Sequence, residues 1–199
     1  YGNQSSVGGD VALSAMGIVL KISMIIVAVC IGIGVGSQPI MGFNRGANLP
    51  KRIKKTYLLA VGCATSVVLL GWLLCELIPD LILKVFGNAD DAFTDFALKA
   101  MRIYLFGIFT SGFQIVTTNY FQATGQPMKA SILSTLRQLL LLIPLIVILP
   151  MFFGLDGILY AGPLADISSG IIVLCFAYHE IKKLNAWIHK ASKESVSAA

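Results

Sequence analysis

Four polar side chains recur on one helical face of an otherwise apolar part of the chain. Ser111, Gln114, Thr118 and Gln122 are separated by three, four and four residues, which places them on the same side of an α-helix. Such a stripe is costly against hydrocarbon, so it must face either a partner helix or a water-filled cleft. The spacing is compatible with both environments.

Two ionisable side chains lie deep inside apolar segments. Lys21 and Asp166 are each about ten residues, or roughly 15 Å of helix, from a segment end. A charge at this depth costs on the order of 3 kcal/mol unless it is paired or hydrated, so both are candidates for a ligand or ion pathway. The two side chains could pair with each other. Alternatively, Lys21 reaches the outer headgroups and Asp166 caps a helix break made by Pro163.

Two further polar candidates follow the first apolar run, in the stretch GSQPIMGFNRGA. Gln38 and Asn44 lie beside a predicted bend, where they either contact a ligand or satisfy local backbone groups. Arg137 lies near a segment boundary, where we expect it to bind lipid phosphate or helix-end carbonyls. Prolines remove a helical hydrogen bond, and those expected to bend or hinge helices are Pro39, Pro144, Pro150 and Pro163.

Five apolar segments must position these residues. Of the 199 residues, 56% are hydrophobic and 13% are charged, and the mean hydropathy is +0.81. This composition indicates that lipid is the solvent, and backbone groups in lipid must pair within helices. We therefore predict an all-α polytopic membrane protein with spans at about 11–35, 56–78, 103–121, 132–153 and 157–178, each near the ~20 residues that a crossing requires.

The basic residues indicate an orientation. Eleven of the 15 Lys and Arg follow the first, third and fifth spans, and the positive-inside bias places these regions in the cytoplasm. The amino end is then outside and the carboxyl end inside, in a cell (inner or plasma) membrane. The net charge of +5 reflects this topology, because no aromatic-interleaved basic surface suited to nucleic acid accompanies it. Residues 191–199 are predicted to form a disordered cytoplasmic tail.

Three stretches resemble a known family. They are GSQPIMGFNRGA followed by KRIKK, NYFQATGQPMKASILSTLRQ from Asn119 to Gln138, and FGLDGILYAGPLAD from Phe153 to Asp166. Together they resemble the carboxyl-terminal lobe of bacterial multidrug and toxic compound extrusion (MATE) transporters, over about residues 1–190. Family members have twelve helices in two lobes, so the resemblance implies that this chain matches helices 8 to 12 and is a fragment. A complete five-helix protein is the alternative.

The resemblance implies secondary active efflux of organic cations or drugs, by antiport with H⁺ or Na⁺, by a longer parent protein. The expected partners are membrane lipid, the drug and the missing amino-terminal lobe. Some members hold the coupling cation with acidic residues on helices 7 and 8. The first span here has no carboxylate and carries Lys21 instead, which puts sodium coupling there in doubt. Proton coupling through Asp166 or through the missing lobe stays open.

Other functions are weighed against this expectation. The sequence has no nucleotide-binding GxxxxGK[ST] loop, catalytic constellation or metal-spaced ligand set, so we expect no enzyme, no cofactor and no metal site. The chain could instead be a structural half-bundle that is inactive alone. A lipid-linked saccharide flippase of similar architecture is a further alternative, although it would be expected to have a more cationic cavity than Lys21 and Arg137 supply.

Overall fold

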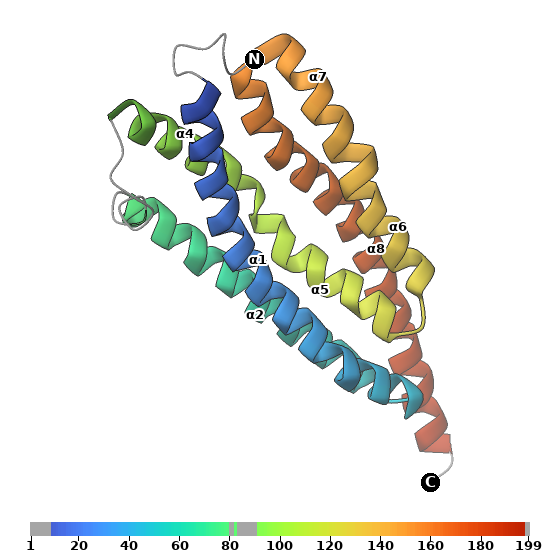
Figure 1. Ribbon diagram of the computed structural model, residues 1–199. Helices are drawn as coiled ribbons and strands as arrows, with labels where there is room; N and C mark the ends of the chain where they lie inside the picture. The colour runs from blue at the N-terminus through green and yellow to red at the C-terminus, as the bar shows by residue number, and fades with distance from the viewer. Residues whose placement is uncertain (1–8, 80–81, 83–90, 198–199) are drawn as a thin grey trace.

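The computed structural model describes residues 9–79, 82 and 91–197, and this part of the chain is all helical, without strands. The helices form an elongated bundle (Figure 1). The α1–α2 turn, the α5–α6 turn and the carboxyl-terminal part of α8 lie at one end, and the α7–α8 turn lies at the other (Figure 1). The all-α prediction is confirmed for the described residues.

Helices α1 (Gly9–Gly46) and α2 (Pro50–Leu77) pack side by side as an antiparallel pair. Their turn contains Asn48 in the left-handed region, with φ of 55°, a conformation that asparagine tolerates well. Pro50 occupies the first turn of α2, where its missing N–H would be unpaired in any case. Both helices extend beyond the predicted spans, 11–35 and 56–78, and α1 passes through Pro39 without ending.

The third predicted span, 103–121, differs most from the structure. Two helices, α4 (Asp91–Gly107) and α5 (Phe109–Ala123), replace one continuous helix. The break coincides with a close approach to α8, because a Cβ on Gly107 would lie 2.5 Å from Pro163 Cα. The sequence pattern does not reveal this junction, since Gly107 and Pro163 are distant in sequence.

The remaining helices form a hairpin of two long rods. The first rod consists of α6 (Pro127–Thr135), the π-helical segment η2 (Leu136–Leu142) and α7 (Ile143–Phe153), and the second is α8 (Leu155–Ser197). The π-helical segment directly precedes Pro144, whose ring would otherwise clash with a carbonyl of the preceding turn. Pro150 and Pro163 lie inside α7 and α8. Because α8 remains helical to Ser197, the structure also differs from the predicted disordered tail.

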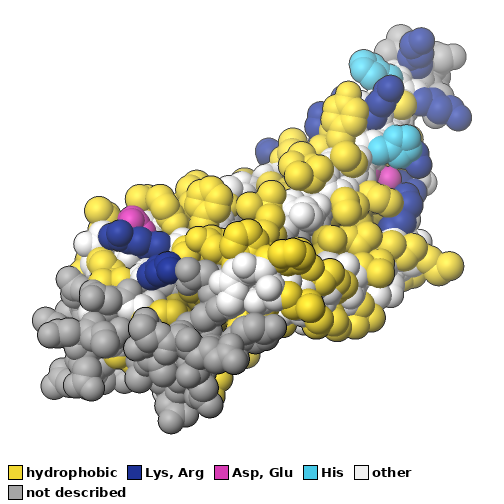
Figure 2. Space-filling view, turned by 90° about the horizontal axis from the view of Figure 1, so that it is seen from above, with side chains coloured by type: hydrophobic (Ala, Val, Ile, Leu, Met, Phe, Trp, Pro, Cys, Tyr) yellow, Lys and Arg dark blue, Asp and Glu magenta, His cyan; other side chains and the backbone are white. Residues whose placement is uncertain are grey.

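The packing is that of a membrane protein. Large apolar side chains face outward, such as Phe152 with 78% of its surface exposed, and they form a broad belt between charged ends in Figure 2. Within the part of the chain that the structure describes, four helices are long and apolar enough to cross a membrane, namely Leu13–Gly46, Pro50–Leu77, Pro127–Phe153 and Gly157–Lys193. We conclude that this is a multi-pass membrane protein.

Candidate functional site

The middle of the polar stripe faces a partner helix. Gln114 Nε2 donates to the backbone carbonyl of Asp166 on α8 at 2.8 Å, and Thr110 Oγ1 donates to the same oxygen at 3.0 Å. Ser169 Oγ lies 3.0 Å from both the Asp166 carbonyl and Gln114 Oε1. Gly170 lets the helices approach, since a Cβ there would lie 2.9 Å from the Thr110 side chain. Gln114 therefore joins α5 to α8.

The ends of the stripe have different surroundings. Ser111 is buried, and its hydroxyl has no hydrogen-bond partner among the described residues. Thr118 Oγ1 donates to the carbonyl of Gln114 at 2.9 Å, within its own helix. Gln122 is exposed and accepts a hydrogen bond from Gln38 Nε2 at 2.9 Å, which connects α5 to α1. The stripe is therefore buried at Ser111 and Gln114, near the beginning of α5, and exposed at Gln122, near its end.

A polar cavity of about 200 Å³ adjoins this face. It lies between α5, the α6–η2 rod and α8, and its polar lining residues are Gln114, Thr118, Asn119, Ser134, Arg137 and Gln138. The stripe therefore meets both environments expected for it, because Gln114 and Thr118 line a cavity while Gln114 also binds the partner helix. Amide, hydroxyl and guanidinium groups converge there on a small volume.

A partly buried ion pair lies beside the cavity. Arg137 Nε and Nη2 lie 2.8 Å and 2.7 Å from Asp166 Oδ1. The Asp166 side chain is only 13% exposed and that of Arg137 is 32% exposed. An isolated carboxylate at this depth would be strongly disfavoured, and the guanidinium compensates its charge through an ion pair and the hydrogen bond that Nε donates. The pair also fastens η2 to α8.

This pair corrects three sequence predictions. Arg137 was expected to bind lipid phosphate or helix-end carbonyls, but it binds the Asp166 carboxylate because η2 packs against α8. Lys21 is exposed on α1 and Asp166 pairs with Arg137, so the structure does not bring Lys21 and Asp166 together, which was one of the two alternatives for them. The alternative role of Asp166 as the cap of a break is also wrong, since α8 continues through Pro163.

The two candidates at the end of α1 differ in their bonding. Asn44 is buried, and its Nδ2 donates to the carbonyl of Ile40 at 2.7 Å, so it satisfies local backbone. Gln38 instead donates to side chains of α5, namely Asn119 Oδ1 and Gln122 Oε1. Gln38 is therefore a bridge between α1 and α5, next to the cavity that Asn119 lines.

Sequence reasoning missed two polar residues. Asn119 lies on α5 beside the stripe, and an asparagine within an apolar span was itself a signal. Glu180 was not singled out from the sequence, but it is buried and accepts a hydrogen bond from Gln126 Nε2 at 2.9 Å. Lys129 Nζ lies 3.6 Å from its other oxygen. The signal for Glu180 was helical periodicity, because it continues the buried face formed by Val173, Ala177 and Leu184.

Comparison with known families decides the identity of this bundle. A family model described as MatE matches residues 4–148. The chain belongs to the MATE family. Members of the MATE family are transporters, which confirms both the predicted resemblance and the prediction that this chain is not an enzyme.

Curated MATE relatives include multidrug export proteins. MepA of Staphylococcus aureus (strain NCTC 8325 / PS 47) is 23% identical over 177 residues, which cover 85% of this chain and 37% of MepA. MepA of strain MRSA252 is 22% identical over the same length. The chain thus spans little more than a third of the length of the curated relatives it matches.

Solved MATE structures share the fold. An outward-facing multidrug resistance MATE transporter matches with a TM-score of 0.81 and 18% identity, over 90% of this chain and 41% of that chain. The inward-facing conformation matches with a TM-score of 0.75 and 18% identity, over 84% and 39%. A MOP superfamily transporter from Pyrococcus furiosus, described as having a binding pocket of reverse polarity, gives 0.79 and 18%, over 89% and 40%.

Proposed function

We propose that this chain is part of a secondary active transporter that exports organic cations or similar drugs by antiport with H⁺ or Na⁺. The observation that carries the proposal is the Arg137–Asp166 pair beside a polar cavity in a membrane bundle of the MATE family. The multidrug export function of MepA supports the substrate class. A partly buried carboxylate of this kind is a functional candidate by default.

The pair suggests how an ion could be coupled to the drug. Protonation of Asp166 would remove the charge that holds Arg137, and the guanidinium would be released toward the cavity that it lines. Gln114 donates a hydrogen bond to the backbone carbonyl of Asp166, so a shift of α8 would also move α5. A proton and a cationic drug would then compete for the same carboxylate, as antiport requires. H⁺ is therefore the coupling ion that we favour.

Efflux from everted vesicles tests the proposal. The full-length protein should extrude ethidium under an imposed proton or sodium gradient, and Asp166→Asn should abolish the proton dependence. Lys182→Gln, on the exposed surface of α8, is the matched control and should keep it. Absence of efflux under every gradient would contradict the proposed function. Unchanged proton dependence in Asp166→Asn would remove that residue from the mechanism.

We also propose a place for this chain within the transporter. In this arrangement α4 and α5 together make one crossing, the five crossings correspond to helices 8 to 12, and residues 1–190 form part of the carboxyl-terminal lobe. The share of the relatives that the chain covers, 37% of MepA and 41% of the outward-facing structure, supports this assignment. Cargo in secondary transporters binds between repeats, so the chain alone would be an inactive half-bundle. Activity that returns only on co-expression with an amino-terminal lobe would support this assignment.

A further inference from the structure

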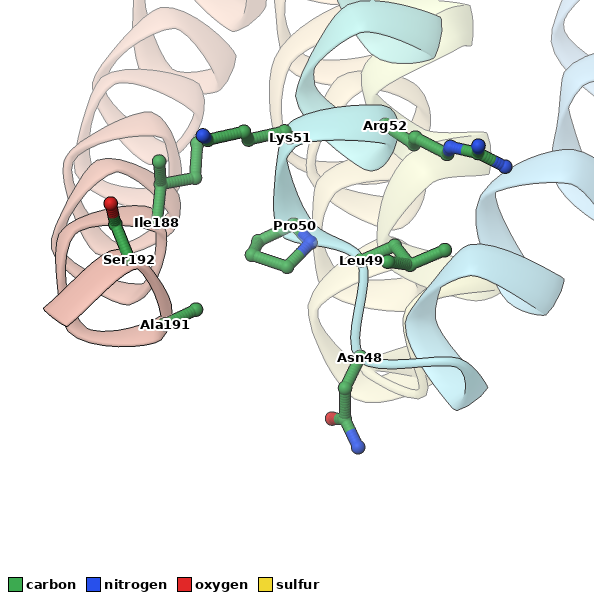
Figure 3. A pocket seen from close by; sticks show the side chains of 8 residues that line it. All are labelled: Asn48, Leu49, Pro50, Lys51, Arg52, Ile188, Ala191 and Ser192. Atoms are coloured by element: carbon green, nitrogen blue, oxygen red, sulfur yellow. The ribbon is translucent and has the colours of Figure 1, made fainter. Parts of the chain in front are cut away.

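A second cavity lies at the end of the molecule that holds the α1–α2 turn (Figure 3). It has a volume of about 310 Å³ and separates the beginning of α2 from the carboxyl-terminal part of α8. Its apolar walls are formed by Leu49 and Pro50 on one side and by Ile188 and Ala191 on the other. These residues are different from those that line the cavity beside Arg137.

The rim of this cavity is cationic. Lys51 extends from the first turn of α2 toward Ile188 and Ser192, while Arg52 points away from α8 (Figure 3). Neither side chain has an ion-pair partner among the residues that the structure describes. Both charges are therefore available to an anion.

Neighbouring basic residues are already engaged in holding the walls together. Arg45 lies over the Trp187 ring, with its Cζ 4.6 Å from the ring centroid. Lys54 Nζ donates to Asn185 Oδ1 at 2.8 Å. These two contacts fix α8 beside the α1–α2 turn, so the cavity is bounded by elements that are already attached to each other.

The surrounding sequence has an excess of positive charge. Residues 45–55 contain five basic and no acidic residues, and residues 181–194 contain four basic residues and one acidic residue, Glu194. Glu180 is nearby in sequence, but its carboxylate is bound by Gln126 and Lys129. An anionic ligand would therefore meet a favourable potential at this end of the bundle.

The position of the cavity corresponds to the headgroup layer. Lys51 precedes Tyr57, where the apolar part of α2 begins, by six residues or about 9 Å of helix. The headgroup and interfacial region adds roughly 5–8 Å on each side of the hydrocarbon core. Lys51 therefore lies near phosphate depth, with apolar walls beside it.

We propose that this cavity binds an anionic phospholipid, whose phosphate contacts Lys51 and whose glycerol and upper acyl chains pack on Leu49 and Ile188. Arg52 adds to the positive potential at the rim. The apolar walls favour a lipid over free phosphate, which would leave them uncovered. The bound lipid bridges the α1–α2 turn and α8. The proposal concerns binding alone and does not depend on which drug or ion is transported.

Native mass spectrometry of the detergent-solubilised full-length protein tests the proposal. The protein is titrated with phosphatidylglycerol, with zwitterionic phosphatidylcholine and with inorganic phosphate. We expect one phosphatidylglycerol molecule to bind about tenfold more tightly than phosphatidylcholine. Each basic side chain near an anionic headgroup strengthens binding several-fold, and the two together give roughly this factor. Inorganic phosphate should not displace the bound lipid.

Two kinds of variant separate this site from general surface charge. Lys51→Gln with Arg52→Gln should reduce phosphatidylglycerol binding about tenfold, and Ala191→Trp should block it without changing any charge. The control, Lys182→Gln with Lys183→Gln, removes two exposed cations that do not line the cavity, and it should retain the bound lipid. Equal loss in the control, unchanged binding in Ala191→Trp, or displacement by inorganic phosphate would each overturn the proposal.

Discussion

Asp166 makes two separate kinds of bond. Its carboxylate pairs with Arg137, and its backbone carbonyl accepts hydrogen bonds from Thr110 and Gln114. A substitution of the side chain therefore leaves the α5–α8 hydrogen bonds intact and removes the charge together with its ion pair to Arg137. Because these two kinds of bond are separate, a substitution of Asp166 can distinguish a role of its carboxylate in ion coupling from a role in the packing of α5 on α8.

Removal of one member of the ion pair should cost more stability than removal of both. Arg137→Met leaves the Asp166 carboxylate unpaired and should reduce the free energy of unfolding by about 2 kcal/mol, whereas Arg137→Met with Asp166→Asn should recover much of this loss. Denaturant unfolding of the purified protein in detergent measures both. Additive effects of the two changes would show that the side chains are not coupled.

Two serines of the same region should respond in opposite directions. Ser111→Ala removes a buried hydroxyl without a described partner and should raise the free energy of unfolding by up to about 1 kcal/mol. Ser169→Ala removes bonds to Gln114 and Asp166 and should lower it by about 1 kcal/mol. Thermal unfolding compares them, and a destabilised Ser111→Ala would mean that its hydroxyl has a partner such as water.

The α4–α5 break and α8 depend on each other at the scale of helices. Gly107 ends α4 against Pro163, and Gly170 of α8 contacts Thr110 of α5. These two glycines thus allow α8 to approach α4 and α5 on both sides of the break between them. The close approach positions Asp166 between them, which connects helix geometry to the candidate site.

A single methyl group at the break should be poorly tolerated. Gly107→Ala would place a Cβ 2.5 Å from the Cα of Pro163, and the resulting overpacking should cost about 1–3 kcal/mol. Gly62→Ala is the control, because a Cβ on that exposed helical glycine meets no atom within 4 Å, and it should stabilise by about 0.5–1 kcal/mol. Thermal unfolding of both proteins in detergent gives the comparison. Equal tolerance would contradict the close approach.

Glu180 should anchor the α5–α6 turn to α8. Its carboxylate accepts a hydrogen bond from Gln126 and lies near Lys129 and the Tyr120 hydroxyl. Glu180→Ala would remove the contacts that these three side chains make with α8 and should cost about 1–3 kcal/mol. His179→Ala, which changes an exposed neighbour, should have little effect. Hydrogen exchange across residues 120–130 should increase only in the Glu180 variant, and unchanged exchange there would contradict the anchor.

The distribution of charge over the whole molecule predicts its orientation. The α1–α2 turn should be cytoplasmic and the α7–α8 turn outside. A membrane-impermeant maleimide should label Asn48→Cys only in everted vesicles and Phe153→Cys only in intact cells, in a protein whose four native cysteines have been replaced. The reverse pattern would contradict the predicted orientation.

Features that depend on the solvent, such as the helical membrane architecture, could be predicted from the sequence. Contacts between segments that are distant in sequence could not. Apolar length was enough for the helical membrane architecture, and three family-like stretches were enough for the family. The Arg137–Asp166 pair was missed because Arg137 was treated as a boundary residue that binds lipid phosphate or helix-end carbonyls, and Lys21 was considered as the partner of Asp166 instead. The break at Gly107 and the burial of Glu180 likewise depend on partners from other helices.

The π-helical segment makes the contacts of its span depend on the number of residues in it. Each residue advances a helix by about 100°, so an extra residue rotates the helical faces that follow it. Arg137 in η2 pairs with Asp166, while α7 packs on α8 beyond it. Deletion of one residue from Leu139–Leu142 would put these two contacts out of phase. In this leucine run the number of residues therefore matters more than the identity of any one of them.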